Sequence, residues 1–199
     1  MKIFIASNNR HKISEIQKIL DSKHPGKYQL LSPSDLNIEL EVEENAPTLE
    51  GNAELKASAF FKAAGIPVIA DDTGLEIDAL EGKPGVFSAR FAGEPSNDAK
   101  NRQKVLDSLK DIPKDKRTAR FRTVICYIDG NHKAFIEGEC EGEIIDKELG
   151  NSGFGYDPIF MPKGYDITFA QMTAEQKNAI SHRGKAILNF ADWLERQQF

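Results

Sequence analysis

Two adjacent acids, Asp71 and Asp72, are the side chains of this sequence best suited to chemistry. They follow a short apolar run, Val68–Ala70, and precede a hydroxyl at Thr73 and a glycine at Gly74. The run predicts the end of a buried strand, and the glycine predicts a turn away from it. Ligands of open α/β sheets bind beyond the carboxyl ends of strands. We therefore expect a divalent cation such as Mg²⁺ beside the two acids. The alternative is a solvated acidic turn.

The first polar loop of the chain predicts an anion-binding site. An apolar run, Lys2–Ala6, predicts a strand before this loop, and isoleucines at helical spacing from Ile13 onward predict a helix after it. Such a loop presents backbone N–H groups and the positive end of the helix dipole to a phosphate. Lys12 adds a positive charge in the first turn. The alternative is an ordinary helix cap with a solvated lysine.

A second acidic stretch is a candidate source of a further metal ligand. Glu39, Glu41 and Glu43 alternate with apolar residues, which predicts an extended segment with the three glutamates on one face. One of these carboxylates would supply an additional oxygen to the cation. The alternative is a solvated edge of the protein.

A glycine-rich segment, Gly150–Phe160, is typical of a backbone that comes close to a ligand. Three glycines within six residues flank the aromatic residues Phe154 and Tyr156. An aromatic ring in such a loop can stack on a nucleic-acid base. Asp157 is restricted by the proline that follows it. The alternative is a turn whose aromatic residues are anchored in the core.

Two cationic residues stand where the last helix is expected to begin. Ser181 predicts a helix cap, so His182 and Arg183 fall at the helix N-terminus, where the helix dipole disfavours positive charge. Local costs of this kind are more often tolerated at functional sites. The alternative is a pair of exposed polar residues.

The order of the expected elements indicates an α/β fold with a mixed sheet flanked by helices. Helices are predicted over Thr48–Ala64, Asp98–Leu109 and Lys185–Arg196. Two runs of strand composition, Thr118–Ile128 and His132–Glu139, flank a turn and predict an antiparallel pair. Because strands separated by helices precede this pair, we expect both strand orientations in the sheet.

Length and composition restrict the class of protein. The 199 residues, 40% apolar and 29% charged, suit a single domain over residues 1–199, made of one body or two closely packed lobes without a linker. A net charge of −5 argues against broad electrostatic binding to nucleic acid. Neither Cys126 nor Cys140 lies in a zinc-binding spacing. The sequence has no signal-peptide pattern and no apolar run of the roughly 20 residues that a membrane helix needs, so we expect a cytoplasmic protein away from membranes.

Five segments carry a resemblance to a known family: Ser7–Lys12, Ala70–Leu75, Pro84–Arg90, Gly153–Pro158 and Ser181–Gly184. Together, and in this order, they resemble the inosine triphosphate pyrophosphatase family, whose members hydrolyse non-standard purine nucleoside triphosphates. The joint pattern is far more specific than any one segment, and it covers nearly the whole chain. The first segment departs from the family, which often has Thr-Gly-Asn where this chain has Ser-Asn-Asn.

The resemblance implies a homodimeric, Mg²⁺-dependent hydrolase that cleanses the nucleotide pool. Such an enzyme cleaves XTP, ITP and dITP to the nucleoside monophosphate and pyrophosphate. The implied fold is an elongated mixed sheet flanked by helices, with two lobes and a central cleft.

The resemblance also implies roles for individual residues. Asp72 would be the general base and a metal ligand, Lys12 would stabilise the leaving pyrophosphate, and Glu43, in preference to Glu44, would be the second metal ligand. The implied substrate contacts are Ser7, Asn8, Asn9, Arg10, His11, Lys12, Thr73, Phe154, Gly155, Tyr156, Asp157, Lys177, His182 and Arg183.

Base selection would follow from hydrogen-bond donors at the purine edge. Phe154 would stack on the ring, while His182 and Arg183 would donate to a 6-oxo or 2-oxo group. Adenine would set its amino group against a donor, and one buried unpaired polar group costs about 1–3 kcal/mol. Rejection of guanine requires a clash or an unpaired donor at its 2-amino group. Two alternatives stay open: a pyrophosphatase for modified pyrimidine triphosphates, and a nucleotide-binding sensor without turnover.

Overall fold

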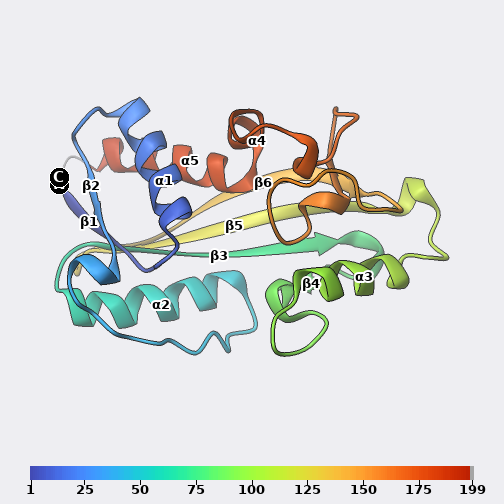
Figure 1. Cartoon of the computed structure of the whole chain (residues 1–199). Helices are drawn as coiled ribbons and strands as arrows, with labels where there is room; N and C mark the ends of the chain where they lie inside the picture. Colours follow the sequence, from blue (N-terminus) through green and yellow to red (C-terminus); the bar gives the residue numbers. More distant parts are fainter. Residues whose placement is uncertain (198–199) are drawn as a thin grey trace. The chain divides into compact units, whose positions relative to one another are not determined.

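The computed structural model describes residues 1–197, apart from the side chains of His11 and Glu15. Within this part of the chain the strands form one seven-stranded mixed sheet in the order β2-β1-β3-β5-β6-β7, with β4 paired to β3 (Figure 1). β1 runs parallel to β2 and to β3, whereas β4 is antiparallel to β3 and β7 is antiparallel to β6. The strands are β1 Lys2–Ile5, β2 Gln29–Leu31, β3 Val68–Ile77, β4 Pro84–Gly85, β5 Thr118–Ile128, β6 Lys133–Ile144 and β7 Phe160–Pro162.

Helices flank this sheet, so the predicted α/β class is confirmed. The helix predicted from Thr48 to Ala64 is observed one residue shorter, because Thr48 is its cap. The last helix begins three residues earlier than predicted, at His182, and Ser181 caps the C-terminus of the preceding helix. The α-helices are α1 Arg10–Lys23, α2 Leu49–Ala64, α3 Asp98–Ser108, α4 Ala174–Ile180 and α5 His182–Arg196. No helix among residues 1–197 has the length and apolar character needed to cross a membrane.

The chain divides into two compact units. Unit 1 consists of Met1–Asp72, Thr123–Gly138 and Arg183–Phe199, and unit 2 consists of Thr73–Arg122 and Glu139–His182. The chain passes from one unit to the other inside β3, β5 and β6, and again at the start of α5. Because these crossings lie within regular elements, no linker composition marks them in the sequence.

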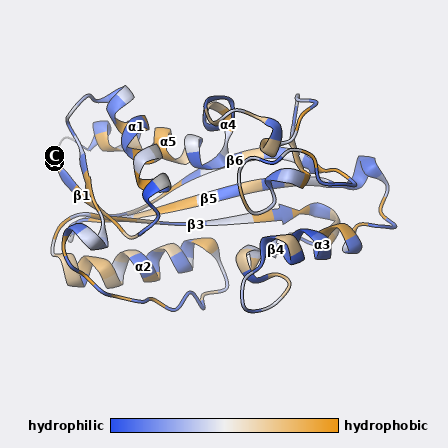
Figure 2. Cartoon of the chain, viewed as in Figure 1, coloured by the Kyte–Doolittle hydropathy of each residue, from blue (hydrophilic) through white to orange (hydrophobic). Residues whose placement is uncertain are grey.

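The core of unit 1 has two layers of apolar side chains, one on each face of its strands. Ile3 and Ile5 of β1 pack with α1 and α5, whereas Phe4 between them packs with α2. This is the alternation that a strand imposes on successive side chains. Figure 1 shows α1 and α5 on one side of β1 and α2 on the other, and Figure 2 shows hydrophobic residues along β1.

The core of unit 2 is built around aromatic rings. Phe121 of β5 lies edge-on to Phe160 of β7 at 4.7 Å between ring centroids, and Phe160 lies 5.0 Å from Phe169. Leu75 and Ile77, in the part of β3 that belongs to this unit, are completely buried in the same cluster. These contacts hold β3 in the sheet well beyond the acidic pair.

The expectation that a strand ends just before Asp71 is therefore wrong. β3 continues through both acids and through Gly74 to Ile77. Burial of Leu75 and Ile77 and antiparallel pairing of Leu75 with Gly85 of β4 extend the strand.

The strand that ends at this level is β1. Its last residue, Ile5, pairs with Ile69 of β3, and the chain then leaves the sheet. The acids thus lie beyond the carboxyl end of the neighbouring strand rather than of their own.

We expect Thr48→Ala to lower the free energy of unfolding by about 1 kcal/mol, as is usual for loss of a helix cap. The Thr48 hydroxyl accepts a hydrogen bond from the Gly51 N–H at 3.1 Å and begins α2. Urea unfolding of both variants measures the change. Thr48→Ser keeps the acceptor and should match the native protein; an equal loss in both variants would contradict a capping role.

Candidate active site

A buried ion pair joins the start of α1 to β3 in unit 1. Lys12 Nζ contacts the carboxylate of Asp71, and the two side chains are only 18% and 9% exposed. Burial lowers the pKa of Lys12 from its ordinary value, although Asp71 opposes that shift. Burial by itself would raise the pKa of Asp71, but the charges of Lys12 and Arg183 hold it at about 2. Asp71 is therefore ionised at neutral pH, and each group stabilises the charged form of the other.

The predicted phosphate loop is shaped by its own side chains. The Asn9 N–H donates to Ser7 Oγ at 3.2 Å, and the Lys12 N–H donates to Asn9 Oδ1 at 3.2 Å. Asn9 thus acts as the acceptor at the beginning of α1. Asn8 and Arg10 are exposed, whereas the side chain of His11 lies outside the described part. The loop leaves the sheet where β1 ends, which is also the level at which β3 reaches its two acids.

The two acids of β3 serve different neighbours. Asp71 faces Lys12 of α1, while the Asp72 carboxylate accepts a hydrogen bond at 3.1 Å from the side-chain amide of Asn52 on α2. Successive strand residues point to opposite faces of a sheet, and α1 and α2 cover opposite faces here. One acid is therefore matched by a cation, and the other is oriented by a neutral amide.

Asn52 and Lys56 are candidate site residues that the sequence analysis missed. Asn52 is 1% exposed, and its amide oxygen also accepts a hydrogen bond from the Ala46 N–H at 2.9 Å. One turn later, Lys56 Nζ lies 3.1 Å from a carboxylate oxygen of Glu44. The signal was present in the sequence, since an asparagine and a lysine four residues apart interrupt the apolar stripe of a helix.

The glutamates of the acidic stretch before α2 differ in their exposure to solvent. Glu43 is exposed, as are Glu39 and Glu41, whereas Glu44 is half-buried and paired with Lys56. Among the described residues, no group of three or more His, Cys, Asp and Glu side chains is arranged to hold a metal ion. The choice of Glu43 over Glu44 as a metal ligand stays a prediction.

Arg183 belongs to the same electrostatic neighbourhood of unit 1. It lines a narrow crevice of about 10 Å³ together with Asp71 and Thr123, and its charge acts on both Lys12 and Asp71. Lys12 and Arg183, separated by most of the sequence, are thus brought together around one carboxylate. Both cations are available to an anionic ligand that approaches this part of unit 1.

In unit 2 the segment Gly153–Asp157, hereafter the base loop, is tightly held. Asp157 is 3% exposed, and its carboxylate accepts hydrogen bonds from the Phe154 N–H at 2.9 Å and from Lys177 Nζ at 2.6 Å. Gly153 has a φ of +78°, and a Cβ there would overlap the Asp157 carboxylate. Glycine is therefore required at this position.

The aromatic residues of the base loop have opposite environments. The Phe154 ring is 59% exposed, with Lys177 Nζ 4.9 Å from its centroid. Tyr156 is buried and donates its hydroxyl hydrogen bond to the Ser88 carbonyl at 2.8 Å. The predicted stacking residue is therefore accessible, whereas the Tyr156 side chain anchors the loop in the core.

The remaining predicted contacts of unit 2 are Thr73 and His182. Thr73 is half-buried on β3. His182 is 5% exposed, and its ring stacks on Phe121 with centroids 4.6 Å apart and planes 18° apart. The alternative of an exposed histidine at the helix start is excluded by this burial. The roles of both residues toward a substrate stay predictions.

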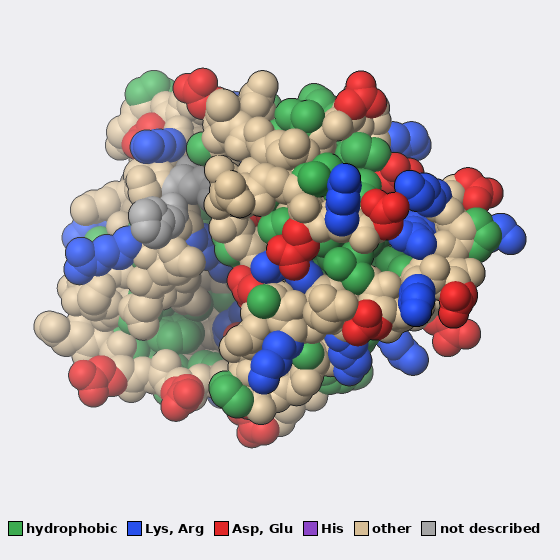
Figure 3. Space-filling model, turned by 45° about the vertical axis from the view of Figure 1, so that its right-hand side comes forward, with side chains coloured by type: hydrophobic (Ala, Val, Ile, Leu, Met, Phe, Trp, Pro, Cys, Tyr) green, Lys and Arg blue, Asp and Glu red, His purple; other side chains and the backbone are tan. Residues whose placement is uncertain are grey.

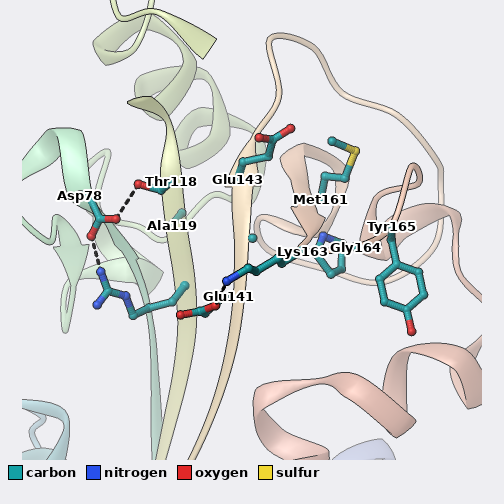
Figure 4. Close-up of a pocket in the computed structure, with 12 residues that line it drawn as sticks. Asp78, Thr118, Ala119, Glu141, Glu143, Met161, Lys163, Gly164 and Tyr165 are labelled. Atoms are coloured by element: carbon teal, nitrogen blue, oxygen red, sulfur yellow. Dashed lines mark hydrogen bonds and ion pairs between the residues drawn. The ribbon is translucent and has the colours of Figure 1, made fainter. Parts of the chain in front are cut away.

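A separate cavity of about 490 Å³ lies within unit 2 (Figure 4). Its charged side chains are mostly paired: Asp78 contacts Thr118 and Arg120, and Lys163 contacts Glu141. None of the predicted site residues lines it. Figure 3 likewise shows acidic and basic side chains interspersed over the face drawn there, in accord with the small net charge.

The chain is similar to known proteins over almost its whole length. Residues 3–193 match the model of the Ham1 family. The chain is 46% identical over 193 residues to a dITP/XTP pyrophosphatase of Porphyromonas gingivalis, covering 97% of both chains. It is 47% identical over 195 residues to a dITP/XTP pyrophosphatase of Flavobacterium psychrophilum, covering 98% of this chain and 100% of the other. The solved structure of the Staphylococcus aureus Ham1 protein is 41% identical and superimposes with a TM-score of 0.89 over the full length of both chains.

The ion pair of Lys12 and Asp71 makes stability depend on pH in a defined window. Because folding lowers the pKa of Asp71 from 3.8 to about 2, its contribution is complete above pH 3.8 and is lost as the pH falls toward 2. We expect Asp71→Asn to show a shallower fall in unfolding free energy across this window, measured by urea unfolding. The exposed Asp166→Asn is the control and should keep the native slope. Equal slopes for Asp71→Asn and the native protein would contradict the assignment.

Proposed function

The chain belongs to the Ham1 family, and from this premise we propose that it hydrolyses non-standard purine nucleoside triphosphates to the monophosphate and pyrophosphate. XTP, ITP and dITP are the proposed substrates. The main support for this proposal is that the two adjacent acids have different partners. Asp71 is matched by Lys12, and Asp72 is held by the Asn52 amide. This arrangement supplies a positive site for phosphate and an oriented carboxylate for chemistry.

We assign the triphosphate to the beginning of α1. Lys12 carries three N–H donors, of which the pair with Asp71 occupies only part. The loop Ser7–Asn9 leads into the positive end of the helix dipole. These groups would stabilise the negative charge that builds up on pyrophosphate as it leaves.

Asp72 is the proposed general base. A water oxygen attacks the α-phosphorus, its proton passes to the Asp72 carboxylate, and the bond from the α-phosphorus to the bridging oxygen breaks. The bridging oxygen leaves with pyrophosphate, so the atoms and charges balance. The hydrogen bond from Asn52 fixes the carboxylate in one orientation, which favours a defined position for the water.

The carboxylates of unit 1 fit a Mg²⁺ ion, which we propose as the cofactor. Mg²⁺ usually takes one or two protein carboxylates and completes its shell with water and substrate phosphates. Asp72 and either Glu43 or Glu44 would provide oxygen donors of this kind. The Asn52 side chain binds both the Asp72 carboxylate and the N–H of Ala46, which lies two residues after Glu44. When bound, the ion would neutralise phosphate charge and polarise the phosphoryl oxygens.

Recognition of the base is assigned to the base loop. The exposed Phe154 ring offers a stacking surface, and Lys177 fixes the loop through Asp157. His182 and Arg183 are the proposed donors to the oxo groups of hypoxanthine and xanthine. The purine amino group of adenine would leave such a donor unpaired.

Assembly and location are proposed on narrower grounds. We propose a homodimer because the family resemblance implies one. A cytoplasmic location is supported by Cys126 and Cys140, which are buried and not joined in a disulfide, as is usual in a reducing compartment.

Incubation with ITP and Mg²⁺ tests the reaction. We expect IMP and pyrophosphate in equal amounts, separated by anion-exchange chromatography, and loss of turnover when EDTA removes the metal. Formation of IDP and orthophosphate would contradict the proposed bond cleavage. Binding of ITP without any product, with Mg²⁺ present, would favour the sensor alternative.

Asp72→Asn tests the proposed base. The change keeps the size of the side chain but removes its basicity, so we expect turnover to fall by roughly 10²–10⁴-fold, the range for general acid–base catalysis. Circular dichroism should show an unchanged fold. The exposed Asp115→Asn serves as the matched control and should retain native turnover. A fully active Asp72→Asn would remove Asp72 from the mechanism.

A further inference from the structure

Helix α3 carries none of the predicted site residues, yet its side chains hold the base loop. Asp98 lies in its first turn, and Arg102 follows four residues later on the same face. Asp98 accepts a hydrogen bond from the Gly155 N–H at 2.8 Å, and Arg102 donates one to the Gly155 carbonyl at 2.8 Å. Gly155 therefore has both of its backbone polar groups fixed by one helix.

Arg102 is itself held in place. Its side chain is 15% exposed, and its Nε lies 2.8 Å from a carboxylate oxygen of Glu148. A guanidinium has several donors in a rigid plane, so one side chain can bind Glu148 and Gly155 together. Asp98, in contrast, is exposed. The hydrogen bond from Arg102 to the base loop is therefore better shielded from competing water than the one to Asp98.

A second route ties the base loop to α3 through the turn at Ser88. Tyr156 donates to the Ser88 carbonyl at 2.8 Å. Asn101 of α3, 2% exposed, donates to the Ala89 carbonyl at 2.9 Å and accepts from the Ala92 N–H at 2.7 Å. This accounts for the segment Pro84–Arg90, which has no role in the chemistry proposed above. Its turn supports the loop rather than the reaction.

The hydrogen bonds to Gly155 and Tyr156 restrict a loop whose two glycines would otherwise allow many backbone conformations. Gly153 and Gly155 flank Phe154 with φ of +78° and +59°, and a glycine samples many backbone conformations when nothing restrains it. The Phe154 ring between these glycines is 59% exposed, so its orientation depends on the backbone of the loop as well as on its contact with Lys177. Fixing Gly155 removes the loop entropy that a ligand would otherwise lose on binding.

We propose that Arg102, assisted by Asp98, is a positioning residue for purine selection. It holds Gly155, and through it the Phe154 ring, in the conformation that receives the base. The proposal rests on the proposed function, since selection presupposes a purine substrate. Because Arg102 contacts the Gly155 carbonyl and Glu148, it acts on the substrate through the loop, and its effect falls on binding and discrimination rather than on the chemical step.

Arg102→Ala and Arg102→Lys test this role. We expect the KM for ITP to rise by about tenfold in Arg102→Ala while kcat stays within about twofold, because only the orientation of the binding surface is lost. The ratio of kcat/KM for ITP over ATP should fall. Amide hydrogen exchange in residues 153–157 should become faster in the same variant. Arg102→Lys should lie between, because a lysine can reach one of the two acceptors.

Arg117→Ala is the matched control. Arg117 is also a largely buried arginine of unit 2 and donates to a backbone carbonyl, that of Ile112, at 3.0 Å. It should lose stability without changing the ITP to ATP ratio or exchange in the base loop. If Arg102→Ala behaves like Arg117→Ala in both measurements, the proposal is overturned. Failure of the native protein to cleave ITP would refute the proposed function instead, while the exchange comparison would still decide whether Arg102 holds the loop.

Discussion

The buried contact between Lys12 and Asp71 sets the arrangement of charged side chains in unit 1. A lysine and an aspartate that are each largely withdrawn from water would be costly separately, and together they fix the first turn of α1 against β3. The same contact leaves Asp72, on the opposite face of the strand, to a different set of neighbours on α2. Because successive strand residues point to opposite faces, Asp71 binds Lys12 while the carboxylate of Asp72 is oriented by Asn52. β1 ends beside them, since its last residue paired with β3 is Ile5, opposite Ile69.

In unit 2 the exposed Phe154 ring lies on a loop whose backbone is hydrogen-bonded to Asp157, Asp98 and Arg102. Its base loop needs glycine at Gly153 because the Asp157 carboxylate occupies the space of a side chain there. The freedom that glycine brings is then removed by Lys177 on one side and by Arg102 on the other. Rigid support of a small binding surface is the general way in which a site obtains discrimination between similar ligands. The proposed stacking ring and the residues that hold its loop thus lie in unit 2, whereas the proposed general base lies in unit 1.

Local signals predicted the elements well where periodicity and caps agreed. The Thr48 cap and the Gly65 end defined α2 to within one residue, and strand composition gave the bounds of β5. The end of β3 was mispredicted because Gly74 was interpreted as a turn, whereas burial of Leu75 and pairing with β4 depend on residues distant in sequence. The partners of Asn52, Lys56 and Arg102 depend on tertiary packing in the same way, so the helices that carry them were predicted but their contacts were not. The family pattern supplied the function, because no single motif specified it.

Attack of water on the α-phosphorus, with the Asp72 carboxylate as base, is the step on which the proposed function depends. Hydrolysis of ITP in ¹⁸O-labelled water identifies the phosphorus that is attacked, because the label enters the product that contains it. We expect one labelled oxygen in IMP and none in pyrophosphate, measured by mass spectrometry after a single turnover. Label in pyrophosphate, with unlabelled IMP, would mean attack at the β-phosphorus and would overturn the proposed step.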